Sequence, residues 1–237
     1  MSIFKRPKLN ISSKFKLPAQ PCVLCGSMSH DGIWCEACDA SMPYLNTPHC
    51  SVCARPTPRG EICGHCLTKP PAFTRTIAVF GYHFPVDRLI QAMKYREQLA
   101  LARIFAEKLL LRIDKSNLPD YVIAMPLHPA KLRRRGFNQA QLIAAPLAKS
   151  LDLPLLNRAC HRLRDTPSQT SLPWKERSKN MRGAFACDMD LSGKHVALVD
   201  DVLTTGASMN ALALTVKQRG AREISAWVIA RSLPHQY

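Results

Sequence analysis

Short apolar runs alternate with longer amphipathic segments through the last two thirds of the chain. The runs have the length and β-branched content of strands, and the longer segments repeat apolar residues every three or four positions, as helices do. The pattern predicts strands at 76–84, 121–127, 153–156, 195–200 and 224–230, and helices at 86–113, 137–151 and 207–219, with a kink or break at Pro146. Strands alternating with helices predict an α/β fold: a mostly parallel sheet flanked by helices, which binds ligands beyond the carboxyl ends of its strands.

Two segments interrupt this alternation. Residues 158–185 are polar, basic and contain prolines, which predicts a long loop that is either functional or disordered. Before residue 71 the periodicity is absent, and Lys69-Pro70-Pro71 indicates a domain boundary. The expected organisation is a flexible basic tail at 1–20, a cysteine-rich module at 21–70 and the α/β domain at 71–237.

The cysteine-rich module is built from four C-x-x-C pairs. Nine residues separate the first pair from the second, and nine separate the third from the fourth, so the module consists of two similar halves. Two thiolates three positions apart can face one point, and two such pairs complete a tetrahedral zinc site. A module of this length buries too little apolar surface to fold alone, so the metal would supply folding energy. The expected ligands of two structural zinc ions are Cys22, Cys25, Cys35, Cys38, Cys50, Cys53, Cys63 and Cys66.

Other uses of the cysteines fit less well. A thioredoxin-type site needs one C-x-x-C rather than four, a disulfide framework needs an oxidising compartment, and a [4Fe–4S] cluster uses different spacings. The pairing within the zinc sites stays open at this point. The matched gaps favour sequential sites over crossed sites that would join the first pair to the third and the second to the fourth.

Charge narrows the class of partner. The 237 residues include 33 Lys and Arg against 17 Asp and Glu, a formal net charge of +16. This excess indicates an anionic partner, such as nucleic acid or a phosphorylated metabolite, although a general basicity of the source proteome would give the same balance. No apolar run reaches the roughly 18 residues of a membrane span, and residues 1–20 lack the apolar core of a secretory signal. We therefore expect a cytoplasmic protein without a membrane span.

The most informative string is residues 196–208, V-A-L-V-D-D-V-L-T-T-G-A-S. An apolar strand ending at Val199 is followed by Asp200 and Asp201, which suit diol hydroxyls or a magnesium ion. Small hydroxyl residues and a glycine then precede a helix, and a helix N-terminus of this kind accepts a phosphate. These phosphate-binding candidates are Thr204, Thr205, Gly206, Ala207 and Ser208. A plain N-capped helix is the simpler alternative, but two aspartates at the end of a buried strand are costly unless they are used.

A second, basic stretch follows the strand at 121–127. Its cations precede a glycine and the start of a helix. The positive charges and the helix dipole together would favour binding of a pyrophosphate. A solvated basic loop would have the same composition. Asn138 is a plausible N-cap of that helix. The candidates for a pyrophosphate clamp and a mobile lid over the site are Lys131, Arg133, Arg135, Asn138, Gln139, Arg164, Gln169 and Arg177.

These motifs together resemble the ComF family, including its GntX-like members. The resemblance runs from about Cys22 to the C-terminus and includes the C-x-x-C repeats, P-L-H-P-x-K-x-R-x-R-G-F-N-Q-A, and R-x-x-N-x-x-G-A-F before the 196–208 string. That string resembles the phosphoribosyl pyrophosphate (PRPP) signature of type I phosphoribosyltransferases. The resemblance implies a small N-terminal zinc-ribbon domain joined to a type I phosphoribosyltransferase-like domain. It also implies that Asp200 and Asp201, the candidate catalytic residues, hold the ribose 2- and 3-hydroxyls near magnesium, that Val199 contributes to PRPP binding, and that 204–208 holds the 5-phosphate.

The family is further associated with natural competence and incoming single-stranded DNA, so single-stranded DNA and proteins of the competence machinery are implied partners. One departure is that a basic stretch at 128–139 replaces the short pyrophosphate loop of many type I enzymes. Lys94 and Tyr95 fall at a family-typical place near the active face, but such a pair on a helix is more often surface packing. Two functions stay open: a Mg-dependent phosphoribosyltransferase of unknown acceptor, and a non-catalytic module that senses PRPP or a nucleotide and binds DNA or protein.

Overall fold

The computed structural model describes residues 19–29, 33–96, 98–165 and 183–233. The chain divides into two compact units, Met1–Ser41 and Met42–Tyr237, and each is described by itself. No helix among the described residues is long and apolar enough to cross a membrane.

The first unit is a small cysteine-bearing fold. Strands β1 (Gln20–Pro21) and β2 (Met28–Ser29) pair in antiparallel fashion, and helix α1 (Glu36–Ala40) follows. Trp34 is buried, and its indole N–H donates to Asp39 Oδ1 at 2.8 Å, while its carbonyl accepts from the Ser29 hydroxyl at 3.2 Å. With so little apolar surface to bury, the unit depends on its cysteine cluster for stability.

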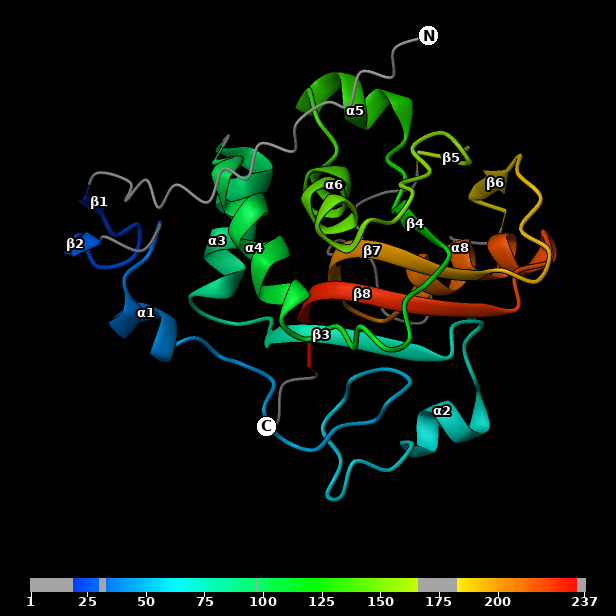
Figure 1. The fold of residues 1–237 in the computed structure, drawn as a ribbon, viewed down its shortest axis with the longest axis horizontal. Coiled ribbons are helices and arrows are strands. Elements are labelled where there is room, and N and C mark those ends of the chain that lie inside the picture. Colours follow the sequence, from blue (N-terminus) through cyan, green and yellow to red (C-terminus); the bar gives the residue numbers. More distant parts are fainter. Residues whose placement is uncertain (1–18, 30–32, 97, 166–182, 234–237) are drawn as a thin grey trace, which may run out of the picture. The chain divides into compact units, whose positions relative to one another are not determined.

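A four-stranded parallel sheet forms the centre of the second unit (Figure 1). Its order is β3 (Arg75–Gly81), β8 (Glu223–Arg231), β7 (His195–Leu203) and β4 (Tyr121–Ala124). Most residues of β7 and β8 are buried on both faces, as expected of strands covered by helices on both sides. The expected α/β class with a parallel sheet is confirmed.

Helices cover both faces of this sheet. On one face, α8 (Ala207–Gln218) packs with Val196 and Leu198 of β7 and Ala226 and Val228 of β8. Alternate residues of the strands point to the other face, where α4 (Ala100–Leu110) and α6 (Gln139–Leu151) pack on each other and on the sheet. Helix α3 (Val86–Tyr95) packs on α4. The short helices are α2 (Gly64–Thr68) and α5 (Pro129–Arg135).

The second cysteine segment covers the outer edge of β3. Leu45 N–H donates to Val79 O at 2.9 Å, Gly81 N–H to Pro43 O at 2.8 Å, and Thr76 N–H to Ser51 O at 2.9 Å. An open edge strand would leave these groups unpaired. The compact unit therefore starts at Met42, whereas the sequence placed a boundary at Lys69-Pro70-Pro71, because main-chain pairing joins the second cysteine cluster to the sheet.

Several element boundaries differ from the sequence prediction. The expected helix at 86–113 is two helices, because the apolar stripe is interrupted after Met93 by several polar residues. The strand predicted at 153–156 is a single bridge between Leu155 and Val122. The expected long loop at 158–185 contains β5 (Cys160–Arg162), which pairs in antiparallel fashion with β6 (Phe185–Cys187).

Two further differences affect the site. The basic stretch expected to be a loop contains α5, which His128 caps by accepting from Ala130 N–H and which Gly136 ends at φ 81°. Strand β7 continues to Leu203, beyond the acidic pair, because β8 pairs with it along that length. Helix α6 includes Pro146 without a break.

Candidate functional site

Each group of four cysteines converges on one point. The sulfur atoms of Cys22, Cys25, Cys35 and Cys38 lie within 4.8 Å of one another, and so do those of Cys50, Cys53, Cys63 and Cys66. The pairing is therefore sequential, as the matched gaps favoured. Sulfur atoms of Cys25 and Cys35 are 3.7 Å apart, and those of Cys53 and Cys63 are 3.6 Å apart. A tetrahedral zinc with Zn–S bonds of about 2.3 Å requires sulfur atoms about 3.8 Å apart, so both clusters fit zinc.

Backbone N–H groups favour the thiolate form of one buried cysteine in each cluster. Leu24 N–H and Cys35 N–H approach Cys22 Sγ at 3.5 and 3.4 Å. Burial opposes ionisation of Cys22, but these N–H groups and that of Cys25 lower its pKa to about 6. In the second cluster burial likewise opposes ionisation of Cys50, and N–H groups of the cluster lower its pKa to about 7. The clusters are two four-cysteine zinc-binding sites, which the metal would hold together.

The acidic pair lies on β7, beyond the point where β4 stops pairing with it. β4 pairs with β7 only as far as Val199, whereas β8 accompanies β7 to Leu203. Asp201 is buried and Asp200 is half-buried. The early end of β4 leaves one side of the acidic pair without a neighbouring strand, and a pocket of about 200 Å³ adjoins it there.

A lysine from α3 neutralises one of the two carboxylates. Lys94 Nζ forms an ion pair with Asp201 Oδ2, and its side chain is 19% exposed. Burial opposes the charge of both partners, but their attraction outweighs it, so the pKa of Lys94 is raised and the pKa of Asp201 is lowered. Burial and the neighbouring Asp201 charge hold the pKa of Asp200 well above its usual value. The charge of Asp201 is therefore neutralised by Lys94, whereas Asp200 has no ion-pair partner among the described residues.

The turn after β7 provides the second half of the site. Gly206 has φ 84°, in the left-handed region, and α8 begins at the next residue. Thr205 Oγ1 accepts from Ala207 N–H at 3.3 Å. Thr204, Gly206 and Ser208 line the same pocket as the acidic pair. This turn thus places hydroxyl groups and a helix N-terminus beside the carboxylates.

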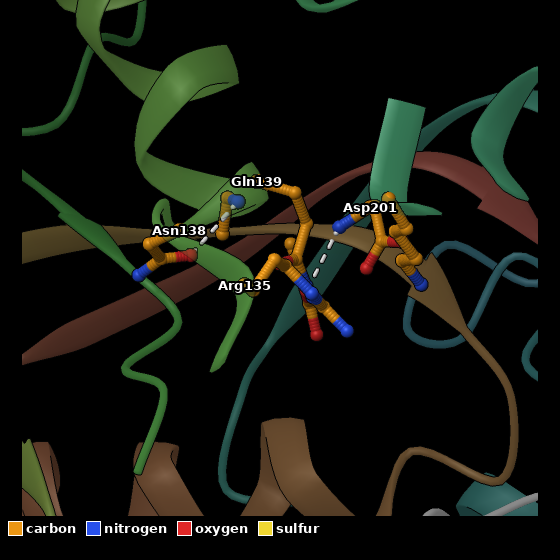
Figure 2. A network of polar contacts seen from close by, with 7 residues as sticks. Arg135, Asn138, Gln139 and Asp201 are labelled. Carbon is orange, nitrogen blue, oxygen red and sulfur yellow. Dashed lines mark hydrogen bonds and ion pairs between the residues drawn. The ribbon is translucent and has the colours of Figure 1, made fainter. Parts of the chain in front are cut away.

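The start of α6 contributes Gln139 to the lining of this pocket. Asn138 caps α6 by accepting from Ala140 N–H at 3.0 Å and donates to Met125 O, also at 3.0 Å. Arg135 Nη1 donates to Gln139 Oε1 at 2.5 Å, and the Arg135 guanidinium lies 5.2 Å from the centre of the Tyr95 ring. Figure 2 shows Arg135, Asn138 and Gln139 with Asp201. Gln139 is buried and lines the pocket.

The structure adds a cation that the sequence did not single out. Arg162, on β5, lines the pocket, and its guanidinium lies 5.5 Å from the Phe185 ring centre. Burial lowers its pKa, while Asp200 and Asp165 act against that shift. Nearby, Lys131 forms an ion pair with Asp165 at 3.3 Å; burial and the Arg162 charge lower the pKa of Lys131. No local signal points to Arg162, because its position depends on the pairing of β5 with β6. Tyr82, which follows β3, also lines the pocket and was missed.

The predicted site residues differ in their relation to this pocket. The acidic pair, Thr204, Gly206, Ser208 and Gln139 line one pocket, and Lys94, which the sequence left as surface packing, lines it with them. Val199 is buried within β7, while Arg133 and Arg164 are exposed. Gln169 and Arg177 lie outside the described residues.

The fold and the clusters define an α/β protein in which a parallel sheet is accompanied by zinc ribbons. A double zinc ribbon domain family matches residues 14–67. The DNA utilization protein YhgH of Escherichia coli (strain K12) is 32% identical over 222 residues, covering 90% of this chain and 97% of its own. Competence protein F of Haemophilus influenzae is 31% identical over 224 residues, covering 89% of this chain and 96% of its own.

The chain belongs to the ComF family, to which these relatives' names point, and the resemblance drawn from the sequence is confirmed. Among solved structures, a purine phosphoribosyltransferase from Pyrococcus horikoshii aligns with 67% of this chain and 88% of its own, at 20% identity and a TM-score of 0.32.

Proposed function

We propose that the second unit binds PRPP together with Mg²⁺ and transfers its phosphoribosyl group to an acceptor. Asp200 and Asp201 would accept hydrogen bonds from the ribose 2- and 3-hydroxyls. Thr204, Thr205 and Ser208, with the N-terminus of α8, would hold the 5-phosphate. Gln139 and Arg162, which line the same pocket, would face the pyrophosphate, and Arg135, which donates to Gln139, and Lys131 would add positive charge beside them.

The observation that supports this proposal most directly is the charge of the acidic pair. Asp201 forms an ion pair with the Lys94 ammonium, while the pKa of the adjacent Asp200 stays raised. Such an arrangement accommodates one further cation or the hydroxyl donors of a diol. A phosphate site at a helix N-terminus, directly after it in the chain, supplies the other half of a sugar phosphate.

Transfer requires little covalent chemistry from the protein. Pyrophosphate leaves the anomeric carbon, and positive charge builds on the ribose while negative charge builds on the leaving group. The acidic pair would stabilise the first, and Arg162 and Arg135 the second. When bound, magnesium would neutralise pyrophosphate oxygens. The acceptor would enter from the opposite face of the ribose.

Calorimetry with PRPP tests this proposal. We expect the zinc-loaded protein to bind PRPP only with Mg²⁺, and the double variant Asp200→Asn, Asp201→Asn to lose binding while it keeps its fold and both zinc ions. Glu107→Gln, an exposed acid on α4, is the matched control and should bind normally. Binding that persists in the double variant would contradict the assignment. Pyrophosphate release with an added acceptor would show turnover.

A second candidate function is a module that senses PRPP or a nucleotide and engages single-stranded DNA or competence proteins. The relatives named for DNA utilization and competence favour it, as does the basic α5, where Arg133 and Arg134 are exposed. DNA binding of this kind should weaken steeply with salt. Replacing both arginines with alanine should lower the salt slope, whereas the double aspartate variant should retain DNA. Equal loss of DNA in both variants would refute separate sites. We also propose a cytoplasmic location, because eight zinc-binding thiols need a reducing compartment.

A further inference from the structure

Arg231, the last residue of β8, is a buried cation with an unusual set of partners. It is 2% exposed. Its Nε donates to Cys53 O at 2.7 Å, and its Nη1 lies 2.7 Å from Leu203 O and 2.5 Å from both Thr204 O and Ser232 O. Each of these four partners is a main-chain carbonyl. A buried guanidinium is costly, and one that is surrounded by carbonyls fixes the peptide groups that bear them.

These carbonyls come from two parts of the second unit that are far apart in sequence. Cys53 is a ligand of the second cysteine cluster, whose sulfur atoms converge as described above. Leu203 and Thr204 begin the turn proposed to bind the 5-phosphate. One planar side chain therefore joins the main chain of a metal ligand to the main chain of the phosphate-binding turn.

The direction of these bonds affects the turn. A trans peptide is planar, so the N–H of one residue points opposite to the carbonyl of the residue before it. Leu203 O and Thr204 O both face the guanidinium, so the N–H groups of Thr204 and Thr205 point away from it. Thr204 also lines the pocket. Arg231 therefore sets the orientation of two peptide groups that a bound phosphate would meet.

A main-chain bond extends the link to β3. Tyr82 N–H donates to Arg231 O at 2.9 Å, and Tyr82 lines the same pocket. Ser232 N–H donates to Leu203 O at 3.0 Å, beside the bond from the guanidinium. The end of β8 is thus held on both sides, and the Arg231 side chain has little freedom to adjust if Cys53 moves.

We propose that Arg231 is a positioning residue that couples metal loading of the second cysteine cluster to the geometry of the phosphate-binding turn. This inference rests on the proposed PRPP site for its effect on affinity, but not for the coupling itself. Loss of metal from this cluster frees the Cys53 main chain, which loosens the guanidinium and with it peptides 203–205. The first cluster, Cys22 to Cys38, belongs to the other compact unit, whereas Arg231 and Cys53 belong to the same one.

Hydrogen exchange tests the coupling without a ligand. In zinc-loaded protein, Cys63→Ser in the second cluster should speed amide exchange in a peptide spanning 203–208, and Cys25→Ser in the first cluster should not. Arg231→Met should speed the same amides while both zinc ions stay bound by metal analysis. Arg222→Met, an exposed arginine at the other end of β8, is the matched control. Unchanged exchange in both Arg231→Met and Cys63→Ser would overturn the proposal.

PRPP affinity is the second readout. We expect Arg231→Met and Cys63→Ser to weaken PRPP binding by about ten- to a hundred-fold. This is the range typical of residues that orient a metal ligand without contacting the metal themselves. Arg231→Lys, which keeps a donor but not the planar fork, should recover part of the loss. Equal weakening by Cys25→Ser would refute the assigned route. If the parent protein binds no PRPP, the proposed function fails, while the exchange experiment still decides the coupling.

Discussion

Lys94→Met removes the ammonium that balances the acidic pair while it keeps most of the volume of the side chain. Lys94 is largely buried and Asp201 is almost wholly so, with side-chain exposures of 19% and 5%. Removing one partner of a buried ion pair costs about 3–5 kcal/mol, because the other charge is left without compensation. We expect the free energy of unfolding of Lys94→Met to fall by an amount approaching this range at pH 8, where both carboxylates are least able to take up a proton.

The loss should depend on pH, and its sign can be worked out. In the parent protein the pKa of Asp201 is lowered, so its ion pair contributes stability above the pKa of the unfolded chain and loses it as pH falls. In Lys94→Met the carboxyl pair instead binds more protons when folded than when unfolded. Its stability should therefore decrease as pH rises, with a slope of about 1.4 kcal/mol per pH unit for each extra proton.

Urea unfolding between pH 6 and pH 8 measures this slope. The control is Arg103→Met, which removes an exposed helix ion pair with Glu107 and should cost less than about 0.5 kcal/mol at any pH in this range. Mg²⁺ should stabilise Lys94→Met more than the parent protein, because the variant lacks the competing ammonium. A pH-independent loss as small as that of Arg103→Met would refute the view that Lys94 neutralises Asp201.

Three further predictions follow from the same geometry. Mg-dependent PRPP binding should strengthen as pH rises through the raised pKa of Asp200, because that carboxyl must lose its proton before both of its oxygens can accept from the ribose hydroxyls, and calorimetry at several pH values checks this. Gly206→Ala should cost about 1–2 kcal/mol in thermal unfolding, because φ is 84° while the added methyl group meets only Leu203 Cδ1 at an ordinary 3.9 Å; an unchanged stability would argue against the left-handed turn. Removing zinc with a chelator should lower the melting temperature of a truncated chain starting at Met42. The segment that bears the second cluster covers the edge of β3, and metal binding at such sites contributes to the free energy of folding. Equal melting temperatures with and without chelator would contradict that role.

Local patterns in the sequence determined much of this protein. The equal gaps between the C-x-x-C pairs predicted the two clusters, because a zinc site needs thiols from two tight turns close in sequence. The acidic pair, the glycine turn and the helix after it are contiguous, so their juxtaposition follows from one strand–turn–helix unit. The alternation of strands and helices predicted the parallel sheet, because each period reflects which faces are buried.

Only the tertiary structure decided which distant groups meet at the site. Lys94 reaches Asp201 because folding brings the last turn of α3 to β7, and apart from the family resemblance nothing in the neighbouring residues indicates that contact. Arg162 depends on the pairing of β5 with β6, and Arg231 on the edge of β3 being covered by the second cysteine segment. The break between α3 and α4 also depends on packing, since a polar stretch continues a helix only where something holds it. Neighbouring residues in the sequence determine the local chemistry of the site, whereas its charge balance depends on elements that only folding brings together.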